Sequence, residues 1–309
     1  MMGTQYASAV AVVRTMENSL FTQSDLERLI NARDRKESET LINSKNAGTL
    51  PEVWEMLRTF APDSKELEII LYRNDFHNLK AVLKAMVSGR EPDSYIIQPS
   101  NIKNDTLKEA FRTKDMDVLP DYIRETATQA YELITTTLDG QLMDSLIDTA
   151  CMKAMQESAE KSGNDFMRKY VNLITVCADI KTAYRCSKMN KNRDFLEISI
   201  CGSPELDKES IIRATLGGTE NLLSFLGNTI YAELSGLLKE NPAEFEKRCD
   251  DMLIELAETS RLQAFGIEPL ISYYIAKEAE IKNIRIISVC RECGADKVTI
   301  TERLRKLYV

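Results

Sequence analysis

The sequence has only one histidine among its 309 residues, His77, and this shortage limits the chemistry available to the chain. It excludes a metal site built on two histidines and a proton relay between histidines. The sequence also lacks a GxxxxGK[ST] phosphate loop, so nucleotide hydrolysis is not expected, and it has no GxSxG motif. We therefore predict no catalytic residues, no cofactor and no metal site.

Glycine and proline are scarce as well, with 12 and 8 residues, and this composition favours long uninterrupted helices. No apolar run reaches the roughly 18 residues needed to cross a bilayer. The N-terminal stretch lacks the basic start of a signal peptide, so we expect a helix there.

The charge balance and the cysteines exclude further classes of protein. The net charge of −8 argues against a general nucleic-acid binder, which needs a basic face to replace counterions. Seven cysteines at irregular spacing indicate a reducing compartment and no disulfide framework. Cys290 and Cys293 have CxxC spacing, but zinc needs four ligands and no second pair lies at a suitable distance, so we interpret the pair as structural.

An asparagine recurs three times inside an apolar frame with helical period. The frames are NDFHNLKAVLKAMVSG around Asn78, RKYVNLITVCADIKTAYR around Asn172 and EAEIKNIRIISVCRECG around Asn283. The asparagines are 94 and 111 residues apart, which indicates a repeated unit of common domain size. An unsatisfied buried amide costs about 1–3 kcal/mol. We interpret the three asparagines, with His77 beside the first, as a structural clasp repeated in each unit.

Each long helix is expected to precede a shorter, capped helix. Capping boxes are predicted at three places: Ser24 with Glu27, Thr106 with Glu109, and Thr299 with Glu302. Asp207 is the expected cap in the middle unit, and the N-terminal pair of helices looks like a fourth, partial copy. Residues 194–201 alternate as a strand would, but they lack a partner, so we expect an extended loop entrance.

Three segments carry a resemblance to a known family. They are YASAVAVVRTMENSLFTQSDLERLI near the start, RNDFHNLKAVLKAMVSG, and EPLISYYIAKEAEIKNIRIISVCRECGADKVTITERLRKLY near the end. With these segments the chain resembles the C subunits of the archaeal and bacterial V/A-type ATP synthases, which correspond to the d subunits of eukaryotic V-ATPases. The resemblance runs over nearly the whole chain, and the middle third matches less closely.

The resemblance implies an all-α fold of three similar helical lobes in a pseudo-threefold, funnel-like arrangement. Approximate lobe boundaries are residues 1–105, 106–210 and 211–309. It also implies a non-catalytic subunit, peripheral on the cytoplasmic face of the membrane, that joins the proteolipid ring to the central shaft of a rotary ATPase and couples ATP chemistry to proton or sodium transport. The ring and the shaft subunits are the expected partners, with the membrane stator subunit as a further candidate.

The polar loops that follow the asparagine-bearing helices are the predicted partner contacts, because loops on a rigid scaffold usually carry recognition. These loops are residues 88–94, 187–194 and 291–296. The basic residues expected to make the contacts are Arg90, Lys188, Lys191, Arg193 and Arg291.

Two alternatives come from other classes of protein. One is an all-helical, Mg²⁺-dependent enzyme, which would need a DDxxD-like cluster, whereas the sequence offers only Asp250 and Asp251. The other is a helical adaptor unrelated to the rotary machine, and the end-to-end motif match argues against it.

Overall fold

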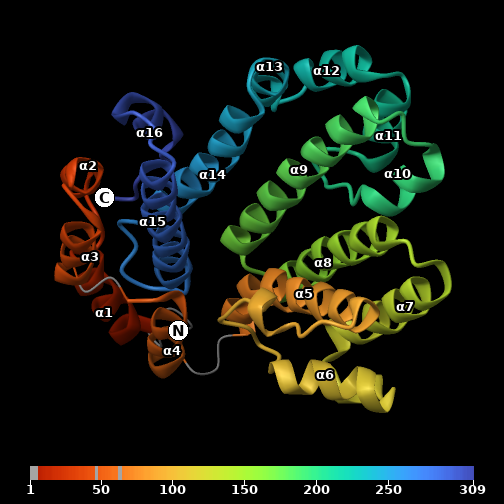
Figure 1. Cartoon of the computed structure of the whole chain (residues 1–309), viewed down its shortest axis with the longest axis horizontal. Helices are drawn as coiled ribbons and strands as arrows, with labels where there is room; N and C mark the ends of the chain where they lie inside the picture. The colour runs from red at the N-terminus through yellow and green to blue at the C-terminus, as the bar shows by residue number, and fades with distance from the viewer. Residues whose placement is uncertain (1–5, 46–47, 62–64) are drawn as a thin grey trace. The chain divides into compact units, whose positions relative to one another are not determined.

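The computed structural model describes residues 6–45, 48–61 and 65–309, and these residues contain helices and no strand (Figure 1). The all-α prediction is therefore confirmed. The first five residues of the predicted N-terminal helix lie outside the described residues. The helices are α1 Ala7–Glu17, α2 Gln23–Asn31, α3 Arg35–Ser44, α4 Leu50–Phe60, α5 Lys65–Ser88, η2 Asp93–Tyr95, α6 Asn104–Thr113, η3 Met116–Val118, α7 Asp121–Thr137, α8 Gly140–Ser162, α9 Asp165–Lys188, α10 Arg193–Ser199, α11 Lys208–Leu216, α12 Thr219–Gly227, α13 Ala232–Glu240, α14 Pro242–Glu258, α15 Glu268–Glu292 and α16 Lys297–Arg303.

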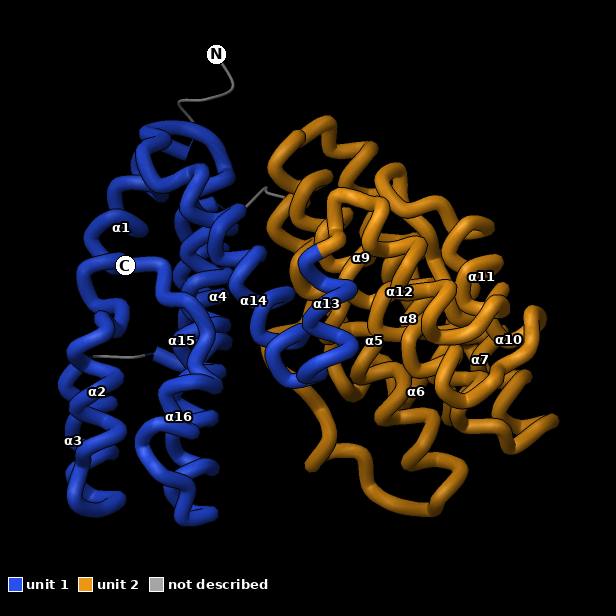
Figure 2. Tube along the Cα trace, turned by 90° about the horizontal axis from the view of Figure 1, so that it is seen from above, with its two compact units in different colours: residues 1–64, 233–309 blue, residues 65–232 orange. Residues whose placement is uncertain are grey.

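The chain forms two compact units, coloured separately in Figure 2. Unit 1 combines both ends of the chain, residues 1–64 and 233–309, and unit 2 comprises residues 65–232. The three-lobe arrangement and its boundaries remain predictions.

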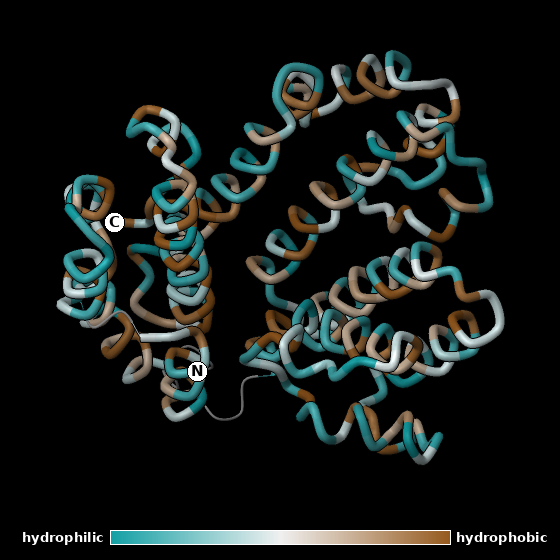
Figure 3. Tube along the Cα trace, in the orientation of Figure 1, coloured by the Kyte–Doolittle hydropathy of each residue, from teal (hydrophilic) through white to brown (hydrophobic). Residues whose placement is uncertain are grey.

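Unit 2 is built on long helices that pack in antiparallel order. Lys80 and Lys84 of α5 form 2.6 Å ion pairs with Asp148 and Asp144 of α8, so α5 runs against α8. Apolar and polar residues alternate along these helices at the scale of a helical turn (Figure 3). The apolar face of α8, which includes fully buried Ile147, packs into the core as helix amphipathicity requires.

Unit 1 is organised around α15, which has both N-terminal and C-terminal segments packed against it. One buried cluster joins Phe21 and Leu26 of the N-terminal segment to Ile287 on α15 and Ile300 on α16. On α4, Trp54 meets Tyr274 of α15 edge-on, with ring centroids 5.8 Å apart. The predicted fourth copy at the N-terminus is thus part of the same core as the C-terminal helices.

The predicted capping boxes are wrong by a few residues. In α2 the cap is Thr22, whose hydroxyl accepts from the Asp25 N–H while the Asp25 carboxylate accepts from the Thr22 N–H. Helix α6 follows Lys103, and α16 is capped by Asp296. Several polar residues lie near each helix start, and the sequence pattern alone does not identify which of them is the N-cap residue. The cap at Asp207 is confirmed, because its side chain accepts from the Ser210 N–H.

Residues 193–199 form α10, so the expected extended segment at 194–201 is wrong. Leu196 and the C-cap residue Ile200 are fully buried, and the Ile200 N–H donates to the Leu196 carbonyl oxygen at 2.9 Å, which closes the last turn of the helix. Alternation favours a strand, but in a run this short periodicity alone does not exclude a helix.

Candidate functional site

Two of the three repeated asparagines tie a long helix to a later stretch of backbone. Asn78 on α5 donates from Nδ2 to the Ile97 carbonyl oxygen at 3.0 Å, and its Oδ1 accepts from the Ile97 N–H at 2.8 Å. Asn283 on α15 exchanges the same two hydrogen bonds with Arg305, at 3.0 and 2.8 Å. Both asparagines are fully buried, so each amide satisfies a backbone donor and a backbone acceptor out of reach of water.

Asn172 on α9 makes a different contact. It is half-buried, and its Nδ2 donates to Oε2 of the exposed Glu205 at 2.6 Å. Its Oδ1 is buried with no hydrogen-bond partner among the described residues. The middle frame therefore does not repeat the backbone clasp of Asn78 and Asn283.

A buried carboxylate on α5 holds the segment that precedes α6. Asp75 accepts hydrogen bonds from the backbone N–H groups of Asn101 at 2.8 Å and Ile102 at 3.1 Å. Its second oxygen accepts from the Asn101 side chain and from the Tyr122 hydroxyl, each at 2.8 Å. Asp75 thus has four donors although it is fully buried.

Asp179 on α9 holds the segment that precedes α11 in the same way. It accepts from the backbone N–H of Cys201 at 2.9 Å and of Gly202 at 2.7 Å. Gly202 has φ +82°, and a Cβ there would lie 2.7 Å from Cβ of Lys208, so only glycine fits this approach.

Glu280 is the corresponding acid on α15, and its partner comes from the other end of the chain. It accepts from the backbone N–H of Phe21 at 2.6 Å, just before α2. Its other oxygen pairs with the ammonium group of Lys277, and both side chains are almost completely buried. The short helix that follows the segment bound by Glu280 is therefore α2, in the N-terminal part of the chain.

The three acids repeat more regularly than the asparagines. Asp75 and Asp179 are 104 residues apart, and Asp179 and Glu280 are 101 residues apart. In this register Thr182, and not Asn172, occupies the place of Asn78 and Asn283, three residues after the acid. Acidic residues inside the apolar stripes of all three frames were the sequence signal that could have revealed this motif.

Burial raises the pKa of both aspartates from the ordinary value near 3.8 to about 6. The hydrogen bonds that each carboxylate accepts lower its pKa, but the loss of hydration outweighs them. Both groups are thus mostly ionised at neutral pH and become protonated in mild acid.

His77 lies one residue before Asn78 and fixes the segment around η2. Its Nε2 is 3.0 Å from the carbonyl oxygen of Tyr95. A carbonyl oxygen can only accept, so this nitrogen carries the proton.

Two of the three predicted contact loops lie at the same end of unit 2. Because α5 and α8 are antiparallel, the C-terminal end of α5 lies beside the N-terminal end of α8. Lys191, after α9, donates to Gln141 on α8 at 2.8 Å, which places the second loop at that end too. The structure thus brings residues 88–94 and 187–194 to one face.

This face combines exposed apolar and basic side chains, and we call it the helix-end surface. Its apolar residues are exposed by 40% for Met86, 44% for Val87, 56% for Met189 and 71% for Leu138. Its basic residues are Arg90, Lys188 and Lys191. Exposed apolar groups beside cations are typical of protein interaction surfaces.

The four predicted cations of these two loops differ in how they are engaged. Lys188 and Lys191 lie over the rings of Tyr184 and Phe195, at 5.3 and 4.4 Å. Arg193 is held by Glu209 at 2.5 Å. In the described part of the chain, the exposed Arg90 side chain has no ion pair.

Arg291 has an internal role in unit 1. Its guanidinium donates to the Leu29 carbonyl oxygen at 2.9 Å, to the Ser38 hydroxyl at 2.6 Å and to the Ala32 carbonyl oxygen. It thereby connects α15 to the end of α2 and to α3.

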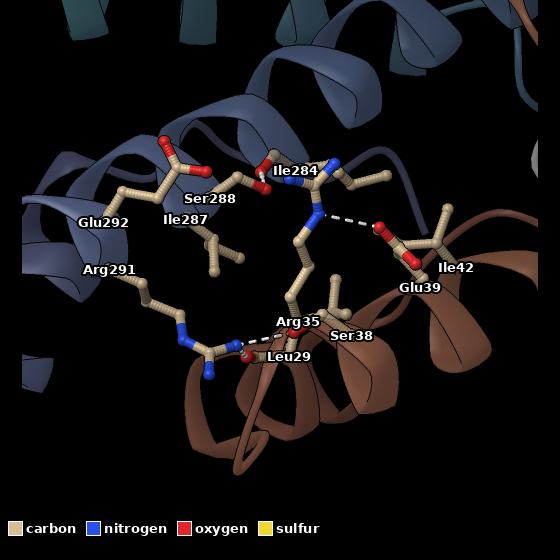
Figure 4. A pocket seen from close by; sticks show the side chains of 10 residues that line it. All are labelled: Leu29, Arg35, Ser38, Glu39, Ile42, Ile284, Ile287, Ser288, Arg291 and Glu292. Carbon is tan, nitrogen blue, oxygen red and sulfur yellow. Dashed lines mark hydrogen bonds and ion pairs between the residues drawn. The ribbon is translucent and has the colours of Figure 1, made fainter.

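A groove of about 410 Å³ lies at this junction of α15 with α2 and α3 (Figure 4). Arg35 and Glu39, one turn apart on α3, form a 2.8 Å ion pair at its rim.

The carboxylates suggested for a magnesium enzyme are already engaged. Asp250 pairs with Lys282 and, at 2.8 Å, with Arg305, while Asp251 accepts from the Lys306 N–H at 2.6 Å. Within residues 6–45, 48–61 and 65–309, no group of three or more potential metal ligands is gathered. In those residues no helix is long and apolar enough to cross a membrane.

These features define an all-helical repeat protein with internally clasped long helices and an exposed helix-end surface. The model of the ATP synthase (C/AC39) subunit family matches residues 35–303, so the chain belongs to that family.

The relatives cover most of the chain. The C subunit of the V-type sodium ATPase of Enterococcus hirae is 24% identical over 83% of this chain and 80% of its own length. The C subunit of the V-type ATP synthase of Thermus thermophilus is 22% identical over 98% of this chain and 99% of its own. The C subunit of the A-type ATP synthase of Methanocaldococcus jannaschii is 23% identical over 91% and 82%.

Proposed function

We propose that this protein is a non-catalytic central-stalk subunit of a V/A-type rotary ATPase. In this role it joins the membrane proteolipid ring to the central shaft, on the cytoplasmic face of the membrane, and couples ATP chemistry to proton or sodium transport. The family match over residues 35–303 is the observation that carries the proposal.

The internal clasps support this role, because a coupler must transmit torque without deforming. Close-packed interiors resist compression and transmit strain. The buried acids bind each long helix to a segment that is distant in sequence, as Asp179 does with Gly202. Such ties stiffen a helix array against relative sliding.

The helix-end surface supports the role by offering a place for partners. Its predicted contacts Arg90, Lys188 and Lys191 have no ion pair among the described residues, and Lys191 already donates a hydrogen bond to Gln141 at 2.8 Å. We expect Arg90→Glu/Lys188→Glu to lower assembly with the isolated shaft subunits at least tenfold and to uncouple ATP hydrolysis from ion transport. The free protein should keep its Tm.

A matched control reverses two exposed lysines near the opposite end of the same helices. Lys161 and Lys169 are 79% and 64% exposed in their side chains, and each has only a neighbouring acid on its own helix. Lys161→Glu/Lys169→Glu should assemble normally. A reconstituted complex that couples normally without this protein would overturn the proposed function.

A further inference from the structure

A hollow of about 390 Å³ lies along the last three turns of α5, and its chemistry differs from that of the groove beside α15. We call it the α5 hollow; it is lined by His77, Lys80, Ala81, Lys84, Ala85, Ser88, Arg90 and Tyr95. The two alanines are buried, and their small side chains leave the depression. Tyr95 stands beside it and is 55% exposed.

The lining residues of the hollow include three cations and the only histidine, and no acid. Lys80 and Lys84 are oriented by Asp148 and Asp144 of α8, which partly neutralise them. The charge of Arg90 is available to pair with a ligand, since none of the described residues forms an ion pair with it. This concentration of positive charge occurs on a chain whose net charge is −8.

The groove beside α15 differs from the α5 hollow in the charges that line it. Its lining includes Glu39 and Glu292 together with Arg35 and Arg291, and both arginines already have partners. That groove has no preference for the sign of a ligand's charge, whereas the α5 hollow favours an anion.

The shape of the hollow favours a side chain over a phosphate group or a bilayer. Phosphate sites commonly use the free N–H groups of a helix N-terminus, whereas α5 presents its C-terminal end here. Two carbonyls near that end are already bonded, Ala85 O to the Arg90 N–H and Lys84 O to the Ser88 hydroxyl. The concave floor formed by the two alanines fits an apolar side chain better than it fits the flat surface of a bilayer.

We propose that the α5 hollow binds an acidic segment of a partner protein. An apolar side chain of that segment fills the space over Ala81 and Ala85, and flanking carboxylates pair with Arg90 and Lys84. This inference rests on the proposed function, since the partner is taken to be another subunit of the rotary ATPase. It adds the chemistry of the segment that is recognised.

The test places a photo-crosslinking benzoylphenylalanine at Tyr95 in the full chain. The complex is purified from native membranes through this chain and irradiated, and the crosslinked peptide is sequenced. We expect a peptide from another subunit with Asp or Glu beside an apolar residue. Arg90→Glu should lower the yield at least tenfold, and Arg90→Lys should retain most of it. The same crosslinker at the exposed Phe265 in unit 1 should be unaffected by either change.

Failure of this proposal differs from failure of the proposed function. An intact complex that gives no adduct at position 95, an adduct with a basic or uncharged peptide, or an adduct with phospholipid overturns the acidic-segment proposal alone. A chain that purifies without any rotary subunit overturns the proposed function and this inference with it. An unchanged yield in Arg90→Glu, with an unchanged Tm, also overturns the assignment of Arg90.

Discussion

Glu280 on α15 accepts a 2.6 Å hydrogen bond from the backbone N–H of Phe21, although 259 residues separate them in sequence. This contact closes the buried cluster in which the N-terminal segment meets α15 and α16. The third apolar frame, on α15, therefore packs against the segment around Phe21 and α2.

Glu280→Gln should destabilise unit 1 by about 3–5 kcal/mol, because it leaves the Lys277 ammonium buried without its counter-charge. Urea denaturation and hydrogen exchange should show the loss in α2 and α16, with α8 as the internal control. Lys277→Met/Glu280→Gln removes both charges and should recover at least half of the loss. If the double variant is less stable than the single one, the buried pair is not the source of the effect.

The asparagines should separate into two groups. Asn78→Leu and Asn283→Leu each leave a backbone N–H and a carbonyl unsatisfied, which should lower the free energy of unfolding by about 1–3 kcal/mol per unsatisfied group. Asn172→Leu loses a contact to the exposed Glu205, so it should cost less than about 1 kcal/mol. Equal losses in all three variants, measured by urea denaturation, would contradict this division.

The raised pKa of Asp179 predicts a specific pH dependence. Its pKa is about 6 in the folded protein and near 3.8 when unfolded, so the folded state holds the proton more tightly. Its contribution is fully present below pH 3.8 and is lost as the pH rises through 6, by about 3 kcal/mol. The unfolding free energy of the parent relative to that of Asp179→Asn should fall by about 2.5 kcal/mol between pH 4, where part of the contribution is already lost, and pH 7.5. A constant difference across this range would contradict the assignment.

Gly202→Ala should be more damaging than other glycine changes with similar backbone angles. Gly202 has φ +82° and also lies close to Lys208, whereas Gly163 has φ +67° with nothing within 4 Å of an added Cβ. We expect about 1 kcal/mol for Gly163→Ala from backbone strain alone, and at least 2 kcal/mol more for Gly202→Ala. Similar melting temperatures for the two variants would show that the close approach is not rigid.

Arg291→Gln should loosen the α2–α3 region without changing unit 2. Three acceptors, among them the carbonyl oxygens of Leu29 and Ala32, lose a charged donor, at a cost of about 1.5–3 kcal/mol for the strongest bond. Hydrogen exchange should increase in α2 and α3 and remain unchanged in α8. If only partner binding changes, Arg291 is a contact residue as the sequence suggested.

The sequence by itself determined the helical class and the position of the longest helices. The apolar frames around Asn78, Asn172 and Asn283 have helical period, and they lie on α5, α9 and α15. These segments are long and strongly periodic, and such patterns depend only on neighbouring residues. Helix starts and the short run at 194–201 were predicted less well, because a few polar or alternating residues fit more than one local structure.

Only the tertiary structure decided which residues act as clasps. Asn172 has the same kind of apolar frame as Asn78, but it bonds only the Glu205 side chain. The backbone N–H groups beside α9 donate to Asp179 instead. The pairing of Glu280 with Phe21 also has no local signal, because it depends on where two distant backbone segments meet. A buried carboxylate must find donors wherever the folded chain brings them, so its partners follow from packing and not from sequence spacing.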